Sequence, residues 1–252
     1  MSQTMTPRQG VPSLRRAAMI AGAAYLITDA TSIYGIFVRS SLIVSGDAAL
    51  TASNIAAHAQ LFRVGVVFDL LTGAGVVILN LALYELLAPV HRSLARLAAL
   101  WRLVEVSMGS AIAVNSLVVL SLLNGADHPQ AFQPRELQAL VRLFVGAQDS
   151  GYMVMLLFAG LGSTTYLYLL VRSRYVPKVL ALLGLAGSAQ VVLFSLARLL
   201  FPAFATLAFA AVRALPAIAL ALLALIFVPI IGFEILRGLW LLVKGVRIPE
   251  QT

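Results

Sequence analysis

Six long apolar stretches constrain the fold of this chain more than any other feature. They occupy residues of about 17–38, 64–87, 94–123, 137–171, 179–200 and 214–236. An α-helix rises about 1.5 Å per residue, so roughly 20 residues cross about 30 Å of hydrocarbon. Each stretch reaches that length, and arginine, proline or other polar residues mark its limits. The sequence therefore predicts an all-α fold: one domain that is a polytopic membrane bundle of six transmembrane helices.

The composition excludes a water-soluble globular enzyme. Hydrophobic residues make up 61% of the chain and charged residues 11%, whereas soluble domains have about 45–50% apolar and about 25% charged residues. The formal net charge is +8, but the arginines lie mainly at the ends of apolar stretches, where they meet headgroups and water. This placement argues against a nucleic-acid partner and leaves membrane lipids as the expected surroundings. No sequence feature identifies a protein partner.

The distribution of basic residues predicts the orientation. If both termini lie on one side, eleven lysines and arginines lie on that side and six on the other, with Arg102 inside a span. The positive-inside rule then places both termini in the cytoplasm, as in a multi-pass protein of the bacterial inner (plasma) membrane. A cleaved signal peptide is the alternative interpretation of the first stretch. That stretch is longer than a typical signal core and contains Asp29, which favours a retained helix.

The longest outer connection, residues 40–62, carries helix signals of its own. From Asp47 or Thr51 onward, a capping residue is followed by alanine-rich helix formers, which predicts a short helix on the outer surface. A plain loop is the alternative. Farther along the chain, Pro229 lies deep inside the sixth stretch and predicts a kink there.

Charged residues of several predicted spans fall at a similar depth in the outer half of the membrane. Counting along the helices from their ends brings together Asp29, Asp69, Asp149, Arg63, Arg142, Arg198 and Arg213, and Tyr25 shares the helix face of Asp29. A charged side chain inside a span costs roughly 2.5–3.5 kcal/mol on insertion scales, so it needs a partner, water or a function. One interpretation is an outward-opening polar cavity that binds a ligand. The other is a set of ion pairs that hold the helices together.

A second group of charges lies on the predicted cytoplasmic side. Arg102 and Glu105 are three residues apart and predict an ion pair within one helix, while Glu85 and Glu234 lie near the inner interface. We interpret this group as structural. The three histidines lie in or beside connections without the spacing of a haem or metal site, and the chain has no cysteine. We therefore expect no metal and no cofactor, and no residue is identified as catalytic.

Seven separated segments cover nearly the whole chain in a distinctive order: RRAAMIAGAAYLITDATSIYG, GDAALTASNI, LFRVGVVFDLL, ALYELLAPVHRSLARLAALWRLVE, DSGYMVMLLFAGL, LYLLVRSRYVPKVLALLGLAG and LWLLVKGVRIP. Together they resemble a bacterial membrane family, the domain of unknown function 4386. That family is similar in size and is described as multi-helix and membrane-embedded. The resemblance implies the same topology and carries no activity.

These observations favour a protein that binds or transports a small solute or lipid-like molecule in an outer-half polar cavity. One alternative is a small membrane enzyme acting on a lipid or isoprenoid, with Asp29, Asp69 or Asp149 as acid or base. Another is an accessory or sensory subunit whose charges only hold helices together or contact a partner. The sequence leaves open whether the chain is an enzyme.

Overall fold

The computed structural model describes the chain except for residues 1–9, 45, 125–132, 202, 204–231 and 246–252. Helices hold 93% of the described residues, and no strand occurs among them. The all-helical class predicted from the sequence is thus confirmed. The helices are α1 (Gly10–Leu42), α2 (Ala48–Ala57), α3 (Ala59–Asn124), α4 (Pro134–Ser173) and α5 (Lys178–Leu200), and residues 232–243 are also helical.

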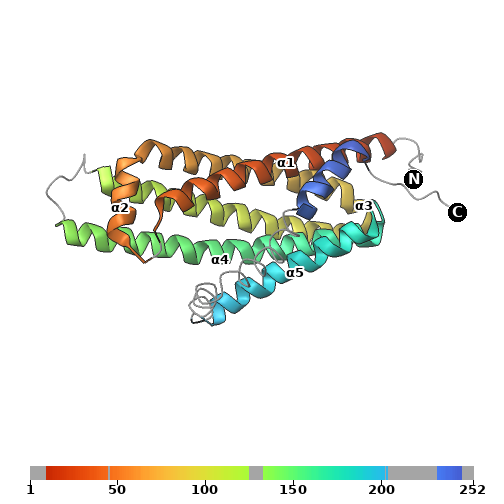
Figure 1. Cartoon of the computed structure of the whole chain (residues 1–252). Helices are drawn as coiled ribbons and strands as arrows, with labels where there is room; N and C mark the ends of the chain where they lie inside the picture. The colour runs from red at the N-terminus through yellow and green to blue at the C-terminus, as the bar shows by residue number, and fades with distance from the viewer. Residues whose placement is uncertain (1–9, 45, 125–132, 202, 204–231, 246–252) are drawn as a thin grey trace, which may run out of the picture.

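The long helices lie side by side in one elongated bundle (Figure 1). The short helix α2 lies across one end, which we call the α2 end. The start of α1, the connection between α4 and α5, and the helix of residues 232–243 lie at the opposite end, which we call the hairpin end. Asp47 caps α2, because its carboxylate accepts a hydrogen bond from the Leu50 amide at 2.9 Å.

Helix α3 is a hairpin of two antiparallel arms, residues 59–90 and 92–124. His91 interrupts the helix with extended backbone angles (φ −162°, ψ 96°), two residues after Pro89. The His91 Nδ1 atom then accepts a hydrogen bond from the Leu94 amide at 3.3 Å. Across the hairpin, the Asn80 side-chain amide donates to the Ala99 carbonyl at 3.2 Å. The two apolar arms of α3 are therefore separate helical segments that run in opposite directions along the bundle, with the turn at His91.

Among the described residues, four helical stretches are long and apolar enough to cross a membrane: Ser13–Leu42, Ala59–Leu123, Arg135–Ser173 and Lys178–Leu200. The stretch Ala59–Leu123 consists of the two antiparallel arms of α3, which the non-helical backbone at His91 separates. These two arms correspond to the second and third predicted spans. Most of the sixth predicted span, with Arg213 and Pro229, lies outside the described residues.

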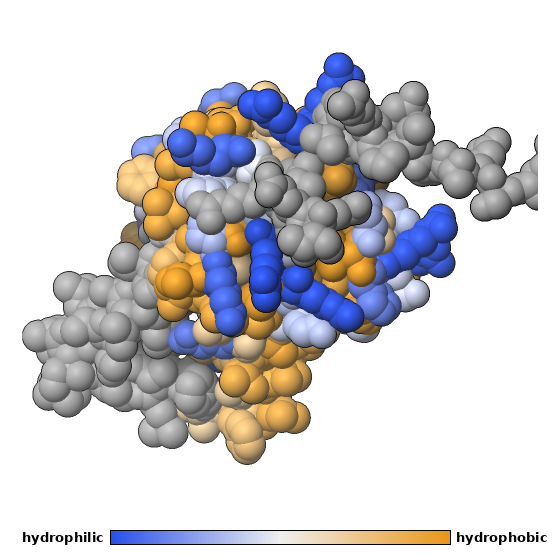
Figure 2. Space-filling model, turned by 90° about the vertical axis from the view of Figure 1, so that its right-hand side faces the viewer, coloured by the Kyte–Doolittle hydropathy of each residue, from blue (hydrophilic) through white to orange (hydrophobic). Residues whose placement is uncertain are grey.

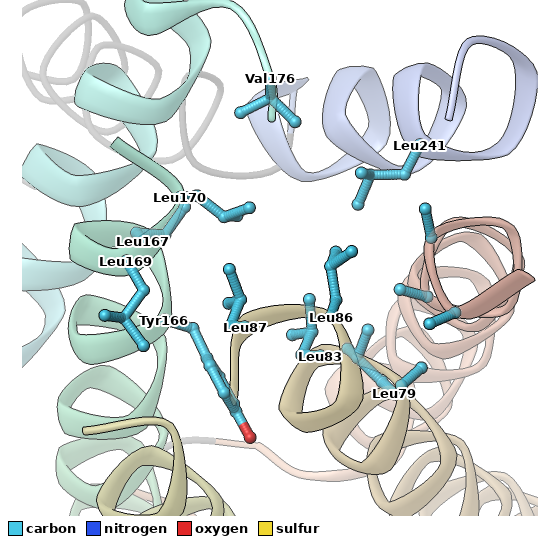
Figure 3. Packing of buried hydrophobic residues seen from close by; sticks show 14 of the residues in the cluster. Leu79, Leu83, Leu86, Leu87, Tyr166, Leu167, Leu169, Leu170, Val176 and Leu241 are labelled. Carbon is cyan, nitrogen blue, oxygen red and sulfur yellow. The ribbon is translucent and has the colours of Figure 1, made fainter. Parts of the chain in front are cut away.

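A tightly packed apolar core fixes the hairpin end. Figure 3 shows side chains from α3, α4 and the helix of residues 232–243 pointing toward one another. The labelled members are Leu79, Leu83, Leu86, Leu87, Tyr166, Leu167, Leu169, Leu170, Val176 and Leu241. The Tyr166 hydroxyl donates to Asn80 Oδ1 at 2.7 Å, so the one polar atom in this group is satisfied. This core holds the α3 hairpin against α4.

The outer surface of the bundle is apolar along its sides and polar at its hairpin end. Large side chains such as Phe37 and Leu193 are about two-thirds exposed on the sides. Viewed end-on, the hairpin end presents hydrophilic side chains surrounded by hydrophobic ones (Figure 2). An apolar belt with a polar end is the distribution typical of a helical bundle in lipid.

Candidate functional site

A cavity of about 290 Å³ lies inside the bundle and receives side chains from every long helix. This volume is at the lower end of the range of ligand pockets, roughly 300–1,000 Å³. The charged and tyrosine side chains that line it are Tyr25, Asp29 and Arg39 of α1, Asp69, Arg102 and Glu105 of α3, Tyr152 of α4, and Glu234 and Arg237. Tyr25 and Arg39 are fourteen residues apart on α1, which corresponds to about 21 Å along the helix. The cavity is therefore long and narrow.

Toward the α2 end, the cavity contains an ion pair between two helices. The Arg39 guanidinium of α1 donates to the Asp69 carboxylate of α3. A glycine makes the room for it, since a Cβ at Gly35 would lie only 2.6 Å from Asp69 Oδ1. In this half of the cavity, each of the two charges has its partner, so the pair connects α1 to α3.

A second ion pair lies within the first turns of the returning arm of α3. Arg102 Nη1 is 2.8 Å from Glu105 Oε2, and the two side chains are only 11% and 12% exposed. The N–H bond does not point at Glu105 Oε2, so this atom has an ionic contact but no aligned hydrogen bond. Gly162 of α4 leaves room for Arg102, because a Cβ there would lie 2.8 Å from its aliphatic carbons. The spacing of these two residues had predicted their pairing.

At the hairpin end, Arg237 is the most deeply buried charge of the site. Its side chain is 3% exposed, and its guanidinium carbon lies 5.3 Å from the centre of the Tyr25 ring. Nε donates to the Phe233 carbonyl at 3.2 Å, and Nη2 lies 3.5 Å from Glu234 Oε1. Nη1 lies against α5 where Gly184 provides space, and it has no hydrogen-bond partner. One nitrogen of this buried guanidinium thus lacks a hydrogen-bond acceptor.

Asp29 is the cavity acid that forms no ion pair with an arginine among the described residues. It lies one helical turn after Tyr25 on α1, and its buried Oδ2 atom has no hydrogen-bond partner. No described residue forms an ion pair with it, whereas Asp69, Glu105 and Glu234 each have an arginine. The neighbouring Thr28 hydroxyl is also buried without a partner. Burying an unpaired carboxylate is costly, so this region favours an added group of opposite charge.

The structure divides the residues that the sequence had grouped into one outer layer. Tyr25, Asp29 and Asp69 line the cavity. Arg63 and Arg142 are exposed and are not part of its lining. Asp149 is 66% exposed and pairs with Arg198 at 2.8 Å, away from the lining. Arg213 lies outside the described residues.

The predicted inner group is divided as well. Arg102, Glu105 and Glu234 line the same cavity as Asp29, whereas Glu85 is exposed and does not. The separation into an outer and an inner layer is therefore corrected: the cavity contains members of both groups.

The register between helices explains this correction. Gly75 of α3 faces the Thr28 hydroxyl, and Gly73 faces Val106 across the hairpin. Asp29 and Glu105 consequently lie at about the same level of the bundle. Counting from the ends of apolar runs assumes that all helices begin at one depth, but interhelical contacts set the register.

Three of the charged and tyrosine lining residues, Arg39, Tyr152 and Arg237, were not predicted. The two arginines were missed because each lies near the end of an apolar run and was assigned to the interface. The glycines carry the relevant signal. Gly35, Gly162 and Gly184 each face a charged side chain of another helix, although glycine in a membrane helix is more often read as a sign of close backbone packing. Among the described residues, no three histidine, aspartate or glutamate side chains gather as a metal site would require.

Comparison with known proteins gives one match. The sequence pattern described as "Domain of unknown function (DUF4386)" matches residues 20–245, which is nearly the whole chain. None of the curated proteins and none of the solved structures compared with the chain matches it. The match includes the first cavity residue on α1, Tyr25, and the last, Arg237.

Proposed function

Because this chain belongs to the family described as Domain of unknown function (DUF4386), we propose a function from its own cavity: it binds or transports a small solute or lipid-like molecule inside a membrane. The observation that carries this proposal is the set of charged side chains from α1, α3 and residues 232–243 around one internal space. Charges in an apolar bundle are costly unless paired or used. Two of them, Asp29 and Arg237, retain unpartnered buried atoms.

The same geometry favours binding over acid–base catalysis. An enzyme acting on a lipid or isoprenoid through two carboxylates needs them within reach of one reacting group. Asp69 is held by Arg39, and Asp149 lies largely exposed beside Arg198. Asp29 is the remaining candidate acid, and it lacks a second free carboxylate among the described cavity residues. A binding role needs no second free carboxylate and is compatible with the observed ion pairs.

We further propose that the hairpin end faces the cytoplasm of a bacterium and that six segments cross its inner membrane, with both termini cytoplasmic. Exposed basic residues gather near the hairpin end: Arg15, Arg16, Arg92, Arg96, Arg172, Arg174, Lys178 and Lys244. Fewer exposed basic residues occur toward the α2 end, among them Arg63, Arg135 and Arg142. This asymmetry supports the orientation through the positive-inside rule.

A cavity-filling variant tests the binding role. Ala159 of α4 lines the cavity, and Ala147 of the same helix is exposed outside it. The purified full chain in lipid nanodiscs is exposed to a panel of amino acids, amines, carboxylates, nucleosides and phospholipids, and its unfolding temperature is recorded. We expect at least one class to raise that temperature in the wild type and in Ala147→Leu but not in Ala159→Leu, because bound ligand stabilises the folded state.

Two results contradict the proposal. One is that no member of the panel, nor any molecule detected by native mass spectrometry, binds the wild type. The other is that Ala159→Leu responds as fully as Ala147→Leu, which places binding elsewhere. Either result leaves the interior charges as structural contacts and favours an accessory subunit.

A further inference from the structure

The hairpin-end half of the cavity contains two groups of opposite charge, Asp29 and Arg237, that each retain one buried atom without a hydrogen-bond partner. We propose that this half binds a small zwitterionic solute, with the ammonium group of the solute at Asp29 and its carboxylate at Arg237. The inference rests on the proposed function and specifies its ligand class. It begins from the buried Asp29 Oδ2 and Arg237 Nη1 atoms, neither of which has a hydrogen-bond partner.

Tyr25 places these two groups within the span of one small molecule. The Arg237 guanidinium carbon lies 5.3 Å from the centre of the Tyr25 ring. Asp29 follows Tyr25 by four residues on α1, and residues at this spacing have Cβ atoms about 5–6 Å apart on one helix face. Both side chains line the same cavity. A solute that contacts both groups therefore lies beside Tyr25.

The pairing of the other charges explains why both ends of the solute are needed. Asp69, Glu105 and Glu234 already have Arg39, Arg102 and Arg237 as partners, respectively. A solute with only an anionic group would leave the buried Asp29 Oδ2 atom without a hydrogen-bond donor. A solute with only a cationic group would leave the N–H bonds of Arg237 Nη1 without an acceptor. A zwitterion satisfies both, which removes two desolvation costs.

The remaining lining of this half suits a short aliphatic linker. Val76 and Leu79 of α3 and Leu167 of α4 contribute apolar surface between the charged residues. The volume of about 290 Å³ excludes a bulky ligand and accommodates a molecule of a few carbon atoms. The chemistry is that of an amino acid whose ammonium and carboxylate groups are separated by methylene groups.

Three probes of similar length separate the contributions of the two charges. 4-Aminobutyrate carries both groups, butyrate carries the carboxylate alone and butylammonium carries the ammonium group alone. Their affinities are obtained from the ligand-dependent unfolding temperature of the full chain in nanodiscs, with glycine and 6-aminohexanoate as a length series. We expect the best zwitterion of the series to bind at least about 10-fold more tightly than either single-charge probe, as loss of a charge-assisted hydrogen bond implies.

Substitutions assign each charge to its residue. Asp29→Asn is expected to weaken the zwitterion about 10- to 100-fold and to leave butyrate unaffected, and Arg237→Gln is expected to weaken the zwitterion similarly and to leave butylammonium unaffected. Asp149→Asn and Arg63→Gln are the matched controls, because both residues are exposed outside the cavity. Helical circular dichroism and monodisperse elution confirm that each variant folds. If Arg237→Gln fails to fold, the comparison of Asp29→Asn with Asp149→Asn still tests whether Asp29 binds the ammonium group of the solute.

The outcomes separate this inference from the proposed function. If none of the zwitterions binds while another panel class binds in an Ala159-sensitive manner, the inference is overturned and the binding role remains. If nothing binds at all, both are overturned. Equal affinities of the three probes, or a zwitterion response that survives Asp29→Asn, also contradict the inference.

Discussion

The two halves of the cavity use the same chemical groups in different ways. Toward the α2 end, Arg39 and Asp69 neutralise each other across two helices. Toward the hairpin end, Arg237 Nη1 has no hydrogen-bond partner and Asp29 forms no ion pair among the described residues. The first arrangement is complete without a ligand, and the second is not. Pairing, rather than depth or residue type, therefore distinguishes a charge that connects helices from a charge that is available for binding.

The largest expected effect comes from disrupting the contact between α1 and the helix of residues 232–243 at the hairpin end. A Cβ at Gly22 of α1 would lie 2.5 Å from the Gly238 carbonyl and from the Leu242 amide, both backbone atoms. Gly22→Leu should therefore displace the helix that positions Arg237 and lower the unfolding free energy by about 3 kcal/mol or more, since backbone cannot yield as side chains do. Reversible unfolding in mixed detergent micelles measures it. Gly146→Leu is the control, because nothing lies within 4 Å of a Cβ there, and an equal loss in both variants would contradict the assignment.

The second-largest expected effect comes from breaking the ion pair between Arg39 and Asp69. Asp69→Asn leaves the Arg39 guanidinium without its counter-charge in the bundle interior. We expect a loss of about 2 kcal/mol of unfolding free energy, as is typical when one partner of a partly buried charged hydrogen bond is removed. The same unfolding assay checks it. A variant as stable as the wild type would show that this pair does not hold α1 to α3.

Replacing Asp29 by asparagine should raise the unfolding free energy slightly or leave it unchanged. Asp29 has no ion-pair partner to lose among the described residues, and an amide is less costly to bury than an unpaired carboxylate. We expect Asp29→Asn to change the unfolding free energy by between zero and about +1 kcal/mol, measured in the absence of added solute. A loss of unfolding free energy as large as that of Asp69→Asn would mean that Asp29, like Asp69, stabilises the fold.

The smallest effect is expected outside the cavity. Asp149 is 66% exposed beside Arg198, and exposed ion pairs contribute about 0.2–1 kcal/mol. Asp149→Asn should therefore reduce the unfolding free energy by less than about 1 kcal/mol and leave solute binding unchanged. If it abolished binding, the site would have to include the exposed surface of α4.

The sequence predicted the helical class because apolar run length is a strong local signal. The predicted limits of the fourth and fifth spans, residues 137–171 and 179–200, lie close to α4 and α5. The second and third predicted spans correspond to the two arms of α3, which the turn at His91 separates, whereas most of the sixth predicted span lies outside the described residues. Periodicity within a run does not reveal how two runs are joined.

Only part of the candidate site was predicted from the sequence, because its arrangement depends on how the helices pack. Tyr25, Asp29, Asp69, Arg102, Glu105 and Glu234 were singled out as polar residues in apolar surroundings, and all of them line the cavity. Their grouping failed because it depended on register between helices, which contacts such as that of Gly75 with Thr28 determine. Arg237 was assigned to the membrane interface, since only the packed structure shows it buried against Tyr25 and Gly184.

One paired measurement tests most directly whether the hairpin-end half of this cavity is a binding site. Asp29→Asn and Asp69→Asn are prepared in parallel, and the solute-induced rise of the unfolding temperature is recorded for each with the panel member that stabilises the wild type most. The structure predicts that Asp69→Asn, though less stable, keeps most of that rise, and that Asp29→Asn, though no less stable, loses it. A rise that disappears in Asp69→Asn and persists in Asp29→Asn would contradict the account.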